Sequence, residues 1–527
     1  DYLRDLGIDA LWLSPIYDSP NDDNGYDIRN YRAIMAEFGS MEDFDRLLAG
    51  LHARGMRLIM DLVVNHTSDE HEWFQQALTD PASPYRDYYI FRDGNPATPP
   101  NNWTSFFSGP AWRWFPDGLN SAGQPGVWAL HLFSPKQMDL NWECAALRAS
   151  VVDMVDWWLS KGVDGFRLDV INYISKQPGL PDGDATIGNL MGFTGVENYY
   201  YGPRLHEYLH QLKVEAFEPH GAFSVGETPG IGIEMAALLT AAPRRELDLI
   251  FNFDQLETPG HARFDRYRYD LNYLARYLTD WTLGYPDSCW MSLFYNNHDN
   301  PRMISKINPD PAVRAPLAKL LALIQLTSQG TPFIFQGDEI GMVNQTFTDM
   351  SQLRDVESLN LYRELIADGH SPADAFATVL AGSRDHARVP MQWHGGDHAG
   401  FSQVTPWIVG DGDQRWCNVA TQLGQADSVL AFYRRLIALR RDTPALVDGD
   451  VRFVASGAKN YFAYVRGSGS QRYAVEGNLS ATPLKRPVAA PQGQLLASTY
   501  PDSDRPAGAH GSQSLRPYEA AMYRLGQ

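Results

Sequence analysis

A carboxylate at the end of a short apolar segment is the group in this sequence best suited to covalent chemistry. The segment is VDGFRLDV (163–170), and its apolar side chains suit a strand packed on both faces. Arg167 and Asp169 are two residues apart, so on a strand their side chains point to the same side. A guanidinium favours the charged form of a neighbouring carboxyl, and a covalent mechanism needs an ionised, positioned nucleophile. A buried structural ion pair is the alternative interpretation.

Polar side chains end three further apolar segments. They are Asn65 and His66 in DLVVNH (61–66), Glu227 in FSVGET (223–228), and His298 and Asp299 in FYNNHD (294–299). One such residue alone is more often a structural hydrogen-bonding group, but three carboxylates, two histidines and an arginine on four strands are difficult to explain as scaffold. A carboxylate kept ionised by Arg167, and a second whose pKa is raised by like charge and desolvation, would supply the nucleophile and general acid/base of retaining glycoside hydrolysis.

Other hydrolytic chemistries have less support. The segment HTSDEH (66–71) contains two histidines, but at a spacing of five residues they do not share a helix face. CxxC, GxSxG and P-loop motifs are absent, so serine hydrolase and NTPase functions have no anchor in the sequence, and we favour a metal-independent hydrolase over a metallohydrolase. We therefore predict no metal ligands among the site residues.

Strand and helix patterns alternate over about the first 340 residues, which predicts parallel strands joined by helical crossovers. The expected strands are 8–13, 57–64, 163–169, 223–225, 247–253, 290–295 and 332–335. The expected helices include 41–54, 145–160, 203–218, 314–328, 353–366 and 428–441. Seven strands are one fewer than a (β/α)8 TIM-type barrel requires. Residues 1–6 resemble the end of a helix, with no start Met or signal peptide, so we expect the first strand to be missing from the chain. Catalytic groups of such barrels lie at the C-terminal ends of the strands.

Two segments interrupt this alternation. Residues 67–140 are rich in Pro, Gly, Asn, Trp and Phe, and we predict an inserted small domain after the third strand that closes over the barrel mouth. Short alternating runs after residue 441, such as YFAYV and RYAVEG, predict a C-terminal antiparallel β domain. The predicted organisation is a catalytic barrel of residues 1–66 and 141–441, an inserted domain of residues 67–140, and a β-sandwich of residues 442–527.

Composition limits the possible partners. The 527 residues suggest two or three domains, and a net charge of −19 disfavours nucleic acid and anionic membrane surfaces as partners. Segments of 18 apolar residues, which would indicate a membrane span, are absent. The three cysteines are widely spaced and odd in number, which favours a reducing compartment and predicts a cytoplasmic protein.

The four clusters, in this order, resemble the sequence regions of the α-amylase superfamily (glycoside hydrolase family 13). Within it the chain is most similar to the oligo-1,6-glucosidase and α-glucosidase group. Further resembling stretches are SPNDDNGYDI (19–28), KQMDLNW (136–142), YYYGPRLHEYL (199–209), GDEIGM (337–342), DVESLNLYRE (355–364) and SRDHARVPMQW (383–393). The resemblance spans nearly the whole chain and implies a TIM barrel with retaining glycosidase activity.

The resemblance also implies a role for each site residue. Asp169 would form the glucosyl-enzyme, Glu227 would be the acid and base, and Asp299 would hold sugar hydroxyls in the transition state. Arg167 would orient Asp169, and His66 and His298 would bind the cleaved glucose. Asp23 and Arg388 would clamp the non-reducing end, with Tyr26 stacked beneath the ring. Phe107, Phe133 and Gln137 would line the entrance, although the two Phe residues would also suit the core of the insertion. Asp61 and Asp27 are expected to be structural.

The Asp–Arg clamp implies a closed pocket and therefore an exo-acting enzyme that releases one glucose. Val170, directly after the nucleophile, resembles the α-1,6-preferring members of the group. Met138 departs from the Pro usual in KQMDLNW and leaves that loop less rigid. RFDRYR (263–268) loosely resembles an arginine- and aspartate-rich segment of sucrose isomerases, but we interpret it as a solvated charged face.

The sequence thus predicts an exo-acting retaining α-glucosidase with α-1,6 or mixed linkage preference. The expected substrates are isomaltose, isomalto-oligosaccharides, maltose and sucrose, and the protein would be a monomer or homodimer. A transglucosylating α-glucosidase or a sucrose isomerase of the same family is the alternative. A non-catalytic relative, such as a transporter heavy chain, would lack the catalytic carboxylates. The chemistry needs no cofactor, and a structural Ca²⁺ or Mg²⁺ would bind, if anywhere, in the missing N-terminal segment.

Overall fold

The computed structural model describes residues 1–501 and 513–526. Residues 502–512 and 527, which belong to the predicted C-terminal domain, lie outside the described residues. The chain divides into two compact units. Unit 1 consists of Asp1–Gly7, Phe253–Tyr285 and Trp290–Gln527, and unit 2 consists of Ile8–Asn252 and Pro286–Cys289.

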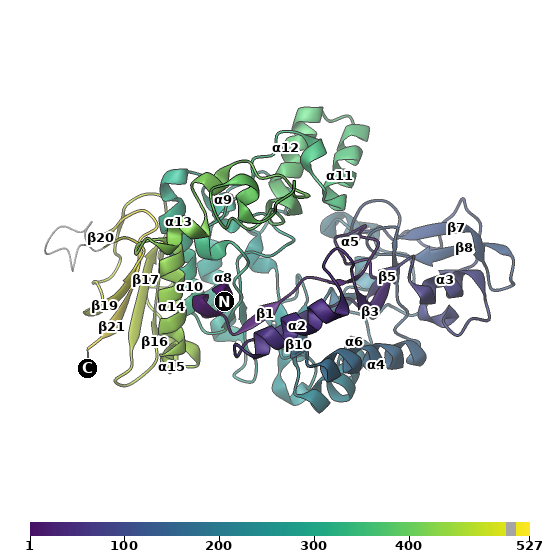
Figure 1. Cartoon of the computed structure of the whole chain (residues 1–527), viewed down its shortest axis with the longest axis horizontal. Coiled ribbons are helices and arrows are strands. Elements are labelled where there is room, and N and C mark those ends of the chain that lie inside the picture. The colour runs from purple at the N-terminus through teal and green to yellow at the C-terminus, as the bar shows by residue number, and fades with distance from the viewer. Residues whose placement is uncertain (502–512, 527) are drawn as a thin grey trace. The chain divides into compact units, whose positions relative to one another are not determined.

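Unit 2 is built on a five-stranded parallel sheet (Figure 1). Its order is β1 (Ala10–Trp12), β4 (Arg57–Leu62), β10 (Gly165–Leu168), β11 (Phe223–Glu227) and β12 (Leu249–Phe251). All four residues of β10 are buried, as expected for a strand covered on both faces. These strands confirm the first five apolar segments predicted from the sequence.

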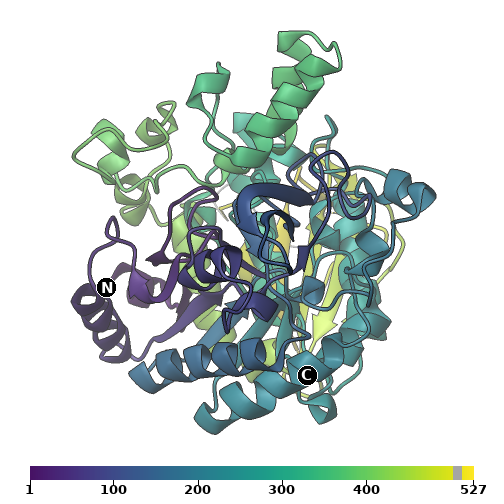
Figure 2. The same ribbon diagram turned by 90° about the vertical axis from the view of Figure 1, so that its right-hand side faces the viewer.

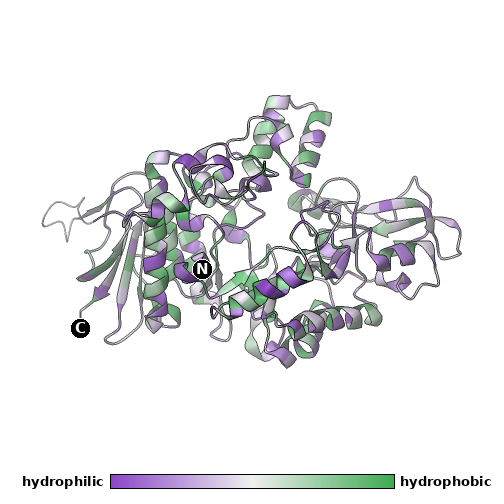
Figure 3. Ribbon diagram, viewed as in Figure 1, coloured by the Kyte–Doolittle hydropathy of each residue, from purple (hydrophilic) through white to green (hydrophobic). Residues whose placement is uncertain are grey.

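Helices join the parallel strands of unit 2 in sequence order. They are α2 (Met41–His52), α4 (Ala145–Lys161), α6 (Leu205–Leu212) with a π-helical turn at Lys213–Phe217, and α7 (Ile233–Thr240). Ser40 begins α2 with a capping box, and hydrophilic and hydrophobic residues are mixed along this helix in Figure 3. Gly162 ends α4 in the left-handed conformation, with a φ of 109° that residues with a side chain rarely adopt. The chain therefore turns directly from α4 into β10.

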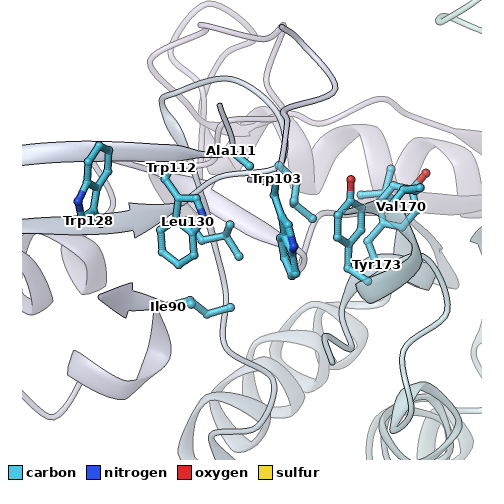
Figure 4. Packing of buried hydrophobic residues seen from close by; sticks show 11 residues of the cluster. Ile90, Trp103, Ala111, Trp112, Trp128, Leu130, Val170 and Tyr173 are labelled. Carbon is cyan, nitrogen blue, oxygen red and sulfur yellow. The ribbon is translucent and has the colours of Figure 1, made fainter. Parts of the chain in front are cut away.

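The predicted insertion is largely a three-stranded antiparallel sheet. Its order is β6 (Phe91–Arg92), β8 (Pro125–Leu130) and β7 (Trp112–Leu119), with α3 (Glu72–Thr79) before it. A second pairing joins β5 (His66–Ser68) to β9 (Gln137–Asp139). Figure 4 shows the core of the insertion, where Trp112 and Leu130 share a cluster with Tyr173 and Val170 from the segment after β10. The insertion is thereby packed against the strand end that carries Asp169.

The remaining elements of unit 2 are short. They are β2 (Tyr17–Asp18) paired with β3 (Asn30–Ile34), and α5 (Ala185–Met191).

Unit 1 contains the last two predicted parallel strands. β13 (Ser292–Leu293) pairs in parallel with β14 (Thr331–Pro332), and α10 (Arg314–Thr327) lies between them in sequence. Two helices that follow β14 in sequence, α11 (Val356–Ala367) and α12 (Pro372–Gly382), lie side by side at the top of Figure 2. The other helices of unit 1 are α1 (Tyr2–Leu6), α8 (Leu271–Gly284), α9 (Met303–Ile307), α13 (Val419–Leu423), α14 (Val429–Arg441) and α15 (Pro444–Val447).

An antiparallel sheet occupies the C-terminal part of unit 1, as predicted. Its order is β15 (Val451–Phe453), β16 (Tyr461–Arg466), β17 (Tyr473–Asn478), β21 (Ala520–Leu525) and β19 (Gly493–Ser498). A smaller pair, β18 (Leu484–Lys485) and β20 (Ser514–Leu515), packs on it through a cluster that includes Tyr461 and Leu515. The predicted boundaries at residues 66/67, 140/141 and 441/442 stay predictions.

Within residues 1–501 and 513–526, every helix is too short or too polar to cross a membrane.

Candidate active site

One buried guanidinium in unit 2 binds both carboxylates predicted to do the chemistry. Arg167 Nη1 donates to Asp169 Oδ1 at 2.6 Å, and Nη2 donates to Glu227 Oε2 at 2.5 Å. Nη1 also donates to Asp61 Oδ1 at 2.8 Å. The Arg167 side chain is 1% exposed, so these contacts are poorly screened by water. Arg167 was expected to orient Asp169, and the structure adds Glu227 and Asp61 to its partners.

The strand register explains why these groups meet. Arg167 of β10 lies opposite Asp61 of β4, and Leu168 lies opposite Gly226 of β11. Asp169 therefore follows β10 at the level where Glu227 ends β11. Parallel strands present their C-terminal ends at one edge, so both carboxylates lie at the edge where barrel enzymes place catalytic groups.

Asp61, which was predicted to be structural, bonds directly to Arg167 and to two aromatic side chains beside it. Its Oδ2 accepts hydrogen bonds from Tyr26 Oη at 3.1 Å and Trp12 Nε1 at 3.3 Å. The Arg167 guanidinium also lies over the rings of Trp12 and Tyr26, at 5.2 and 5.7 Å from their centroids. Burial raises the pKa of Asp61 to about 6, although the Arg167 charge lowers it.

A second cluster in unit 2 joins three residues that were predicted to bind the sugar. The β5–β9 pairing brings Gln137 to His66, with 3.2 Å between their Nε2 atoms. Gln137 Nε2 donates to Asp23 Oδ2 at 3.2 Å, so Gln137 connects the histidine to the carboxylate. Burial lowers the pKa of His66 to about 4, which keeps the ring neutral near pH 7 and able to accept or donate a hydrogen bond. Asp27 Oδ1 accepts from the Asp23 backbone N–H at 3.0 Å, which fits its predicted structural role.

Met138 lies in β9 between Gln137 and Asp139, where it is buried opposite Thr67 of β5. This segment pairs as a strand and is not the expected loop, whereas the lower rigidity expected from Met138 in place of Pro stays a prediction.

The two Phe residues predicted at the entrance lie together beside His66. The Phe133 ring centroid is 5.3 Å from that of His66 and 5.5 Å from that of Phe107. Phe133 also stacks on Phe106 at 5.2 Å, within the insertion. Phe133 is therefore both part of the insertion core and a neighbour of a predicted sugar ligand.

Val170 has an unusual backbone conformation directly after Asp169. Its φ is 36° and its ψ is 41°, a left-handed conformation that is strained for a β-branched residue. In this conformation its backbone N–H donates to Glu227 Oε2 at 3.0 Å. The strained turn therefore holds the carboxylate of Glu227 near the end of β10.

Unit 1 contains the remaining predicted site residues around Asp299. Asp299 Oδ1 accepts from Arg388 Nη2 at 2.9 Å and from Arg384 Nη1 at 3.4 Å, and Oδ2 lies 3.0 Å from His298 Nε2. Burial opposes ionisation of Asp299, but His298 and the two arginines outweigh it and hold its pKa well below the ordinary value. Arg388 Nε also donates to the His298 backbone carbonyl at 2.9 Å. Asp299 is thus an ionised hydrogen-bond acceptor whose side chain is 19% exposed.

Several residues of these networks were not identified from the sequence. Arg384 lies in the quoted motif SRDHAR, but its bond to Asp299 and its 2.8 Å bond to Asp355 carried no separate signal. Lys176 forms a buried ion pair of 2.6 Å with Asp139 and was not expected. Arg263 Nη1 donates to the Asp299 backbone carbonyl at 2.9 Å, so the interpretation of its segment as a solvated face is wrong for this residue.

No group of three or more His, Cys, Asp or Glu side chains in the described part of the chain is arranged to hold a metal ion.

A pair of carboxylates bound to one guanidinium at the C-terminal edge of parallel strands is characteristic of barrel enzymes that cleave glycosides. The family model "Alpha amylase, catalytic domain" matches residues 1–449, and the chain belongs to this family. Its fold is accordingly the (β/α)8 barrel of α-amylases with a C-terminal antiparallel β domain, and the protein is a glycoside hydrolase. The predicted family membership is confirmed, whereas the absent first strand stays a prediction.

Similar proteins carry several activities. An oligo-1,6-glucosidase of Halalkalibacterium halodurans is 42% identical, covering 99% of this chain and 92% of the relative. A trehalose-6-phosphate hydrolase of Escherichia coli is 41% identical, with the same coverage of both chains. The crystal structure of a trehalulose synthase from Pseudomonas mesoacidophila MX-45 matches with a TM-score of 0.90 and 37% identity, covering 99% of this chain and 93% of that one.

Proposed function

We propose that this protein is an exo-acting, retaining α-glucosidase that releases glucose from the non-reducing end of short α-glucosides with α-1,6 or mixed linkages. Asp169 is the nucleophile and forms a glucosyl ester. Glu227 protonates the leaving oxygen and then takes a proton from the incoming water. Asp299 accepts hydrogen bonds from the hydroxyls of the distorted sugar in the transition state.

The single observation that carries this assignment is the Arg167 guanidinium shared between Asp169 and Glu227, at 2.6 and 2.5 Å. Both carboxylates reach one guanidinium, so they lie close together, as retaining glycosidases require of a nucleophile and its acid/base partner. The positive charge favours the ionised nucleophile. When the ester at Asp169 removes one negative charge, the remaining charge on Arg167 stabilises the ionised form of Glu227, which is then the base.

The exo-acting mode is proposed from the cluster of Asp23, Gln137 and His66. Their side chains are fixed to one another by hydrogen bonds of 3.2 Å and are almost fully buried. Such a preorganised set of polar groups suits the hydroxyls of a single terminal glucose. Arg388 would take part through the guanidinium nitrogen Nη1, which is buried and has no hydrogen-bond partner among the described residues.

The proposed linkage preference rests on Val170 and on similarity to the oligo-1,6-glucosidase. Val170 follows the nucleophile directly and is 9% exposed. A change of a methyl group at this position alters how the leaving sugar is seated, which is worth about 1–3 kcal/mol in discrimination.

A sucrose isomerase or transglucosylating activity is the second candidate, and one observation favours it. Arg263 begins the segment similar to sucrose isomerases and bonds to the carbonyl of Asp299, and a trehalulose synthase is among the similar structures. In this case a second sugar, in place of water, would attack the ester at Asp169.

The test compares kcat/KM for isomaltose, maltose, sucrose and trehalose 6-phosphate on one preparation, with the products identified. The proposal predicts that isomaltose is the best substrate and that glucose is the main product. Isomaltulose or trehalulose from sucrose would support the second candidate. Efficient cleavage of trehalose 6-phosphate alone, the substrate in the name of one relative, would overturn both.

Cofactor requirement, location and oligomeric state are proposed from the sequence alone. We propose that the reaction needs no cofactor and that the protein is a cytoplasmic monomer or homodimer whose partners are small α-glucosides.

A further inference from the structure

We infer that Asp338 is a positioning residue that fixes the turn carrying His298 and Asp299. The inference rests on the proposed function, because it matters for catalysis only if Asp299 binds the transition state. Asp338 follows β14 and is not one of the predicted site residues. Asp338 would act on Asp299 through this turn, so the inference needs no direct contact between the two carboxylates.

One oxygen of Asp338 is bound from both sides of the turn. Its Oδ1 accepts from Asn296 Nδ2 at 2.9 Å and from Arg302 Nη1 at 3.3 Å. Asn296 precedes His298 by two residues, and Arg302 follows Asp299 by three. A single buried carboxylate therefore holds the entry and the exit of the turn.

Further hydrogen bonds close the turn on itself. Asn296 Oδ1 accepts from the Met303 backbone N–H at 2.7 Å, so the first residue of the turn is joined directly to α9. Within the turn, Asn297 Oδ1 accepts from the Asp299 backbone N–H at 3.0 Å and from Asn300 Nδ2 at 2.9 Å. These bonds fix the local shape of the turn, whereas Asp338 anchors it to the loop after β14.

Arg302 depends strongly on Asp338. It is 0% exposed, and its Nε and Nη2 atoms have no hydrogen-bond partner among the described residues. The face of its guanidinium lies 4.6 Å from the Phe335 ring centroid, and the Phe335 backbone N–H donates to Asp338 Oδ2 at 3.2 Å. Burial raises the pKa of Asp338 to about 7, although the charge of Arg302 lowers it, so the ion pair is fully formed only above pH 7. There Asp338→Asn would leave the buried Arg302 cation with a neutral amide, this aromatic contact and the more distant charge of Glu339. Arg302 would then move, and the turn would move with it.

The consequence for catalysis is a displacement of Asp299. A misplacement of about 1 Å can cost about 100-fold in rate even when the change is remote from the chemistry. Because Asp299 acts mainly in the transition state, the loss is expected in kcat more than in KM.

The test measures kcat and KM for maltose, and inhibition by 1-deoxynojirimycin, in the whole protein. Asp338→Asn is expected to lower kcat about 10- to 100-fold and to weaken 1-deoxynojirimycin binding at least 5-fold, with KM within 3-fold. Asp338→Glu, which keeps the charge, should recover part of kcat. A kcat within twofold of wild type in a folded Asp338→Asn variant overturns the inference.

A matched control separates positioning from general destabilisation. Glu476→Gln removes a buried carboxylate that pairs with Arg486 at 2.7 Å in the C-terminal sheet. It should lower the melting temperature as Asp338→Asn does but leave kcat within twofold of wild type. An equal loss of kcat in both variants overturns the inference.

Asn296→Leu provides a second variant without a buried charge change, in case Asp338→Asn does not fold. It should lower kcat about 10-fold, and an unchanged kcat contradicts the role of the turn anchor. Asp299→Asn, measured in parallel, distinguishes the two levels of the proposal. If Asp299→Asn is active, the proposed role of Asp299 fails; if it is inactive while Asp338→Asn and Asn296→Leu are normal, only the positioning inference fails.

Discussion

Replacing Arg167 with methionine tests whether the ion pairs between Arg167 and its three carboxylate partners stabilise unit 2. The substitution keeps an apolar stem of similar length but removes the guanidinium that binds Asp61, Asp169 and Glu227 at 2.8, 2.6 and 2.5 Å. Removal of one partner from a buried ion pair typically costs about 3–5 kcal/mol, because an uncompensated charge remains. At about 2–4 °C per kcal/mol for a unit of this size, the melting temperature should fall by about 6–20 °C at pH 7.

The pH dependence of this loss follows from linkage. Without Arg167 the pKa values of the three buried carboxyls rise in the folded state above their unfolded values near 4, and that of Asp61 is already about 6 with the arginine present. The folded variant then binds more protons than its unfolded state between about pH 4 and 7, so its stability increases as the pH falls. The deficit relative to wild type should therefore be smaller at pH 5 than at pH 7.

Differential scanning calorimetry at both pH values measures the effect, with Arg486→Met as the control. The side chain of Arg486 is 6% exposed and pairs with Glu476 in the C-terminal sheet of unit 1, outside the network of unit 2. Its removal should cost less, show a weaker pH dependence and leave kcat unchanged. The reasoning is refuted if the decrease in melting temperature of Arg167→Met is the same at pH 5 and pH 7, or is no larger than that of Arg486→Met. The network would then not stabilise unit 2 as proposed.

Three further predictions concern single residues. His71 accepts from the Trp73 N–H at the start of α3, and burial lowers its pKa to about 4, below the unfolded value of about 6.5. The stability that this neutral histidine contributes is complete above pH 6.5 and is lost as the pH falls toward 4. His71→Asn keeps a capping acceptor, so its melting temperature should fall less than that of wild type between pH 7 and pH 5. Equal falls in melting temperature would show that another group is responsible. Glu227→Gln should slow maltose hydrolysis far more than hydrolysis of α-glucosyl fluoride, whose leaving group needs no proton, and similar losses on both substrates would remove Glu227 from the acid role. Val170→Ala should shift the isomaltose-to-maltose ratio of kcat/KM toward maltose by about 10-fold or more, and an unchanged ratio would move the linkage determinant elsewhere.

The strands and helices could be predicted because their apolar patterns reflect burial. The segment 57–64 is β4 over Arg57–Leu62, and the expected helix at 145–160 is α4 over Ala145–Lys161. Asp169 and Glu227 could be placed at one sheet edge because parallel strands share the direction of their C-terminal ends. Both predictions depend on local periodicity and chain direction, and these can be read from a single sequence.

The partners of each side chain were harder to predict, since they depend on register and on contacts far apart in sequence. Arg167 meets Asp61 only because the two residues are opposite each other across β4 and β10, and they are 106 residues apart. Arg263 was interpreted as solvated because its neighbours are charged, whereas in the structure it bonds to the carbonyl of Asp299. Lys176 carried no pattern in the sequence, since its partner Asp139 lies on β9 within the predicted insertion, 37 residues earlier in the chain.

The most direct test of the proposed mechanism is to trap the glucosyl-enzyme with 5-fluoro-α-D-glucosyl fluoride and to map the modified peptide by mass spectrometry. The account predicts one fluoroglucosyl group per chain, attached to Asp169 in the segment 163–170, and no label in Asp169→Asn. A label on another residue, or none while the reagent inactivates the enzyme, would contradict the assignment of Asp169 as the nucleophile.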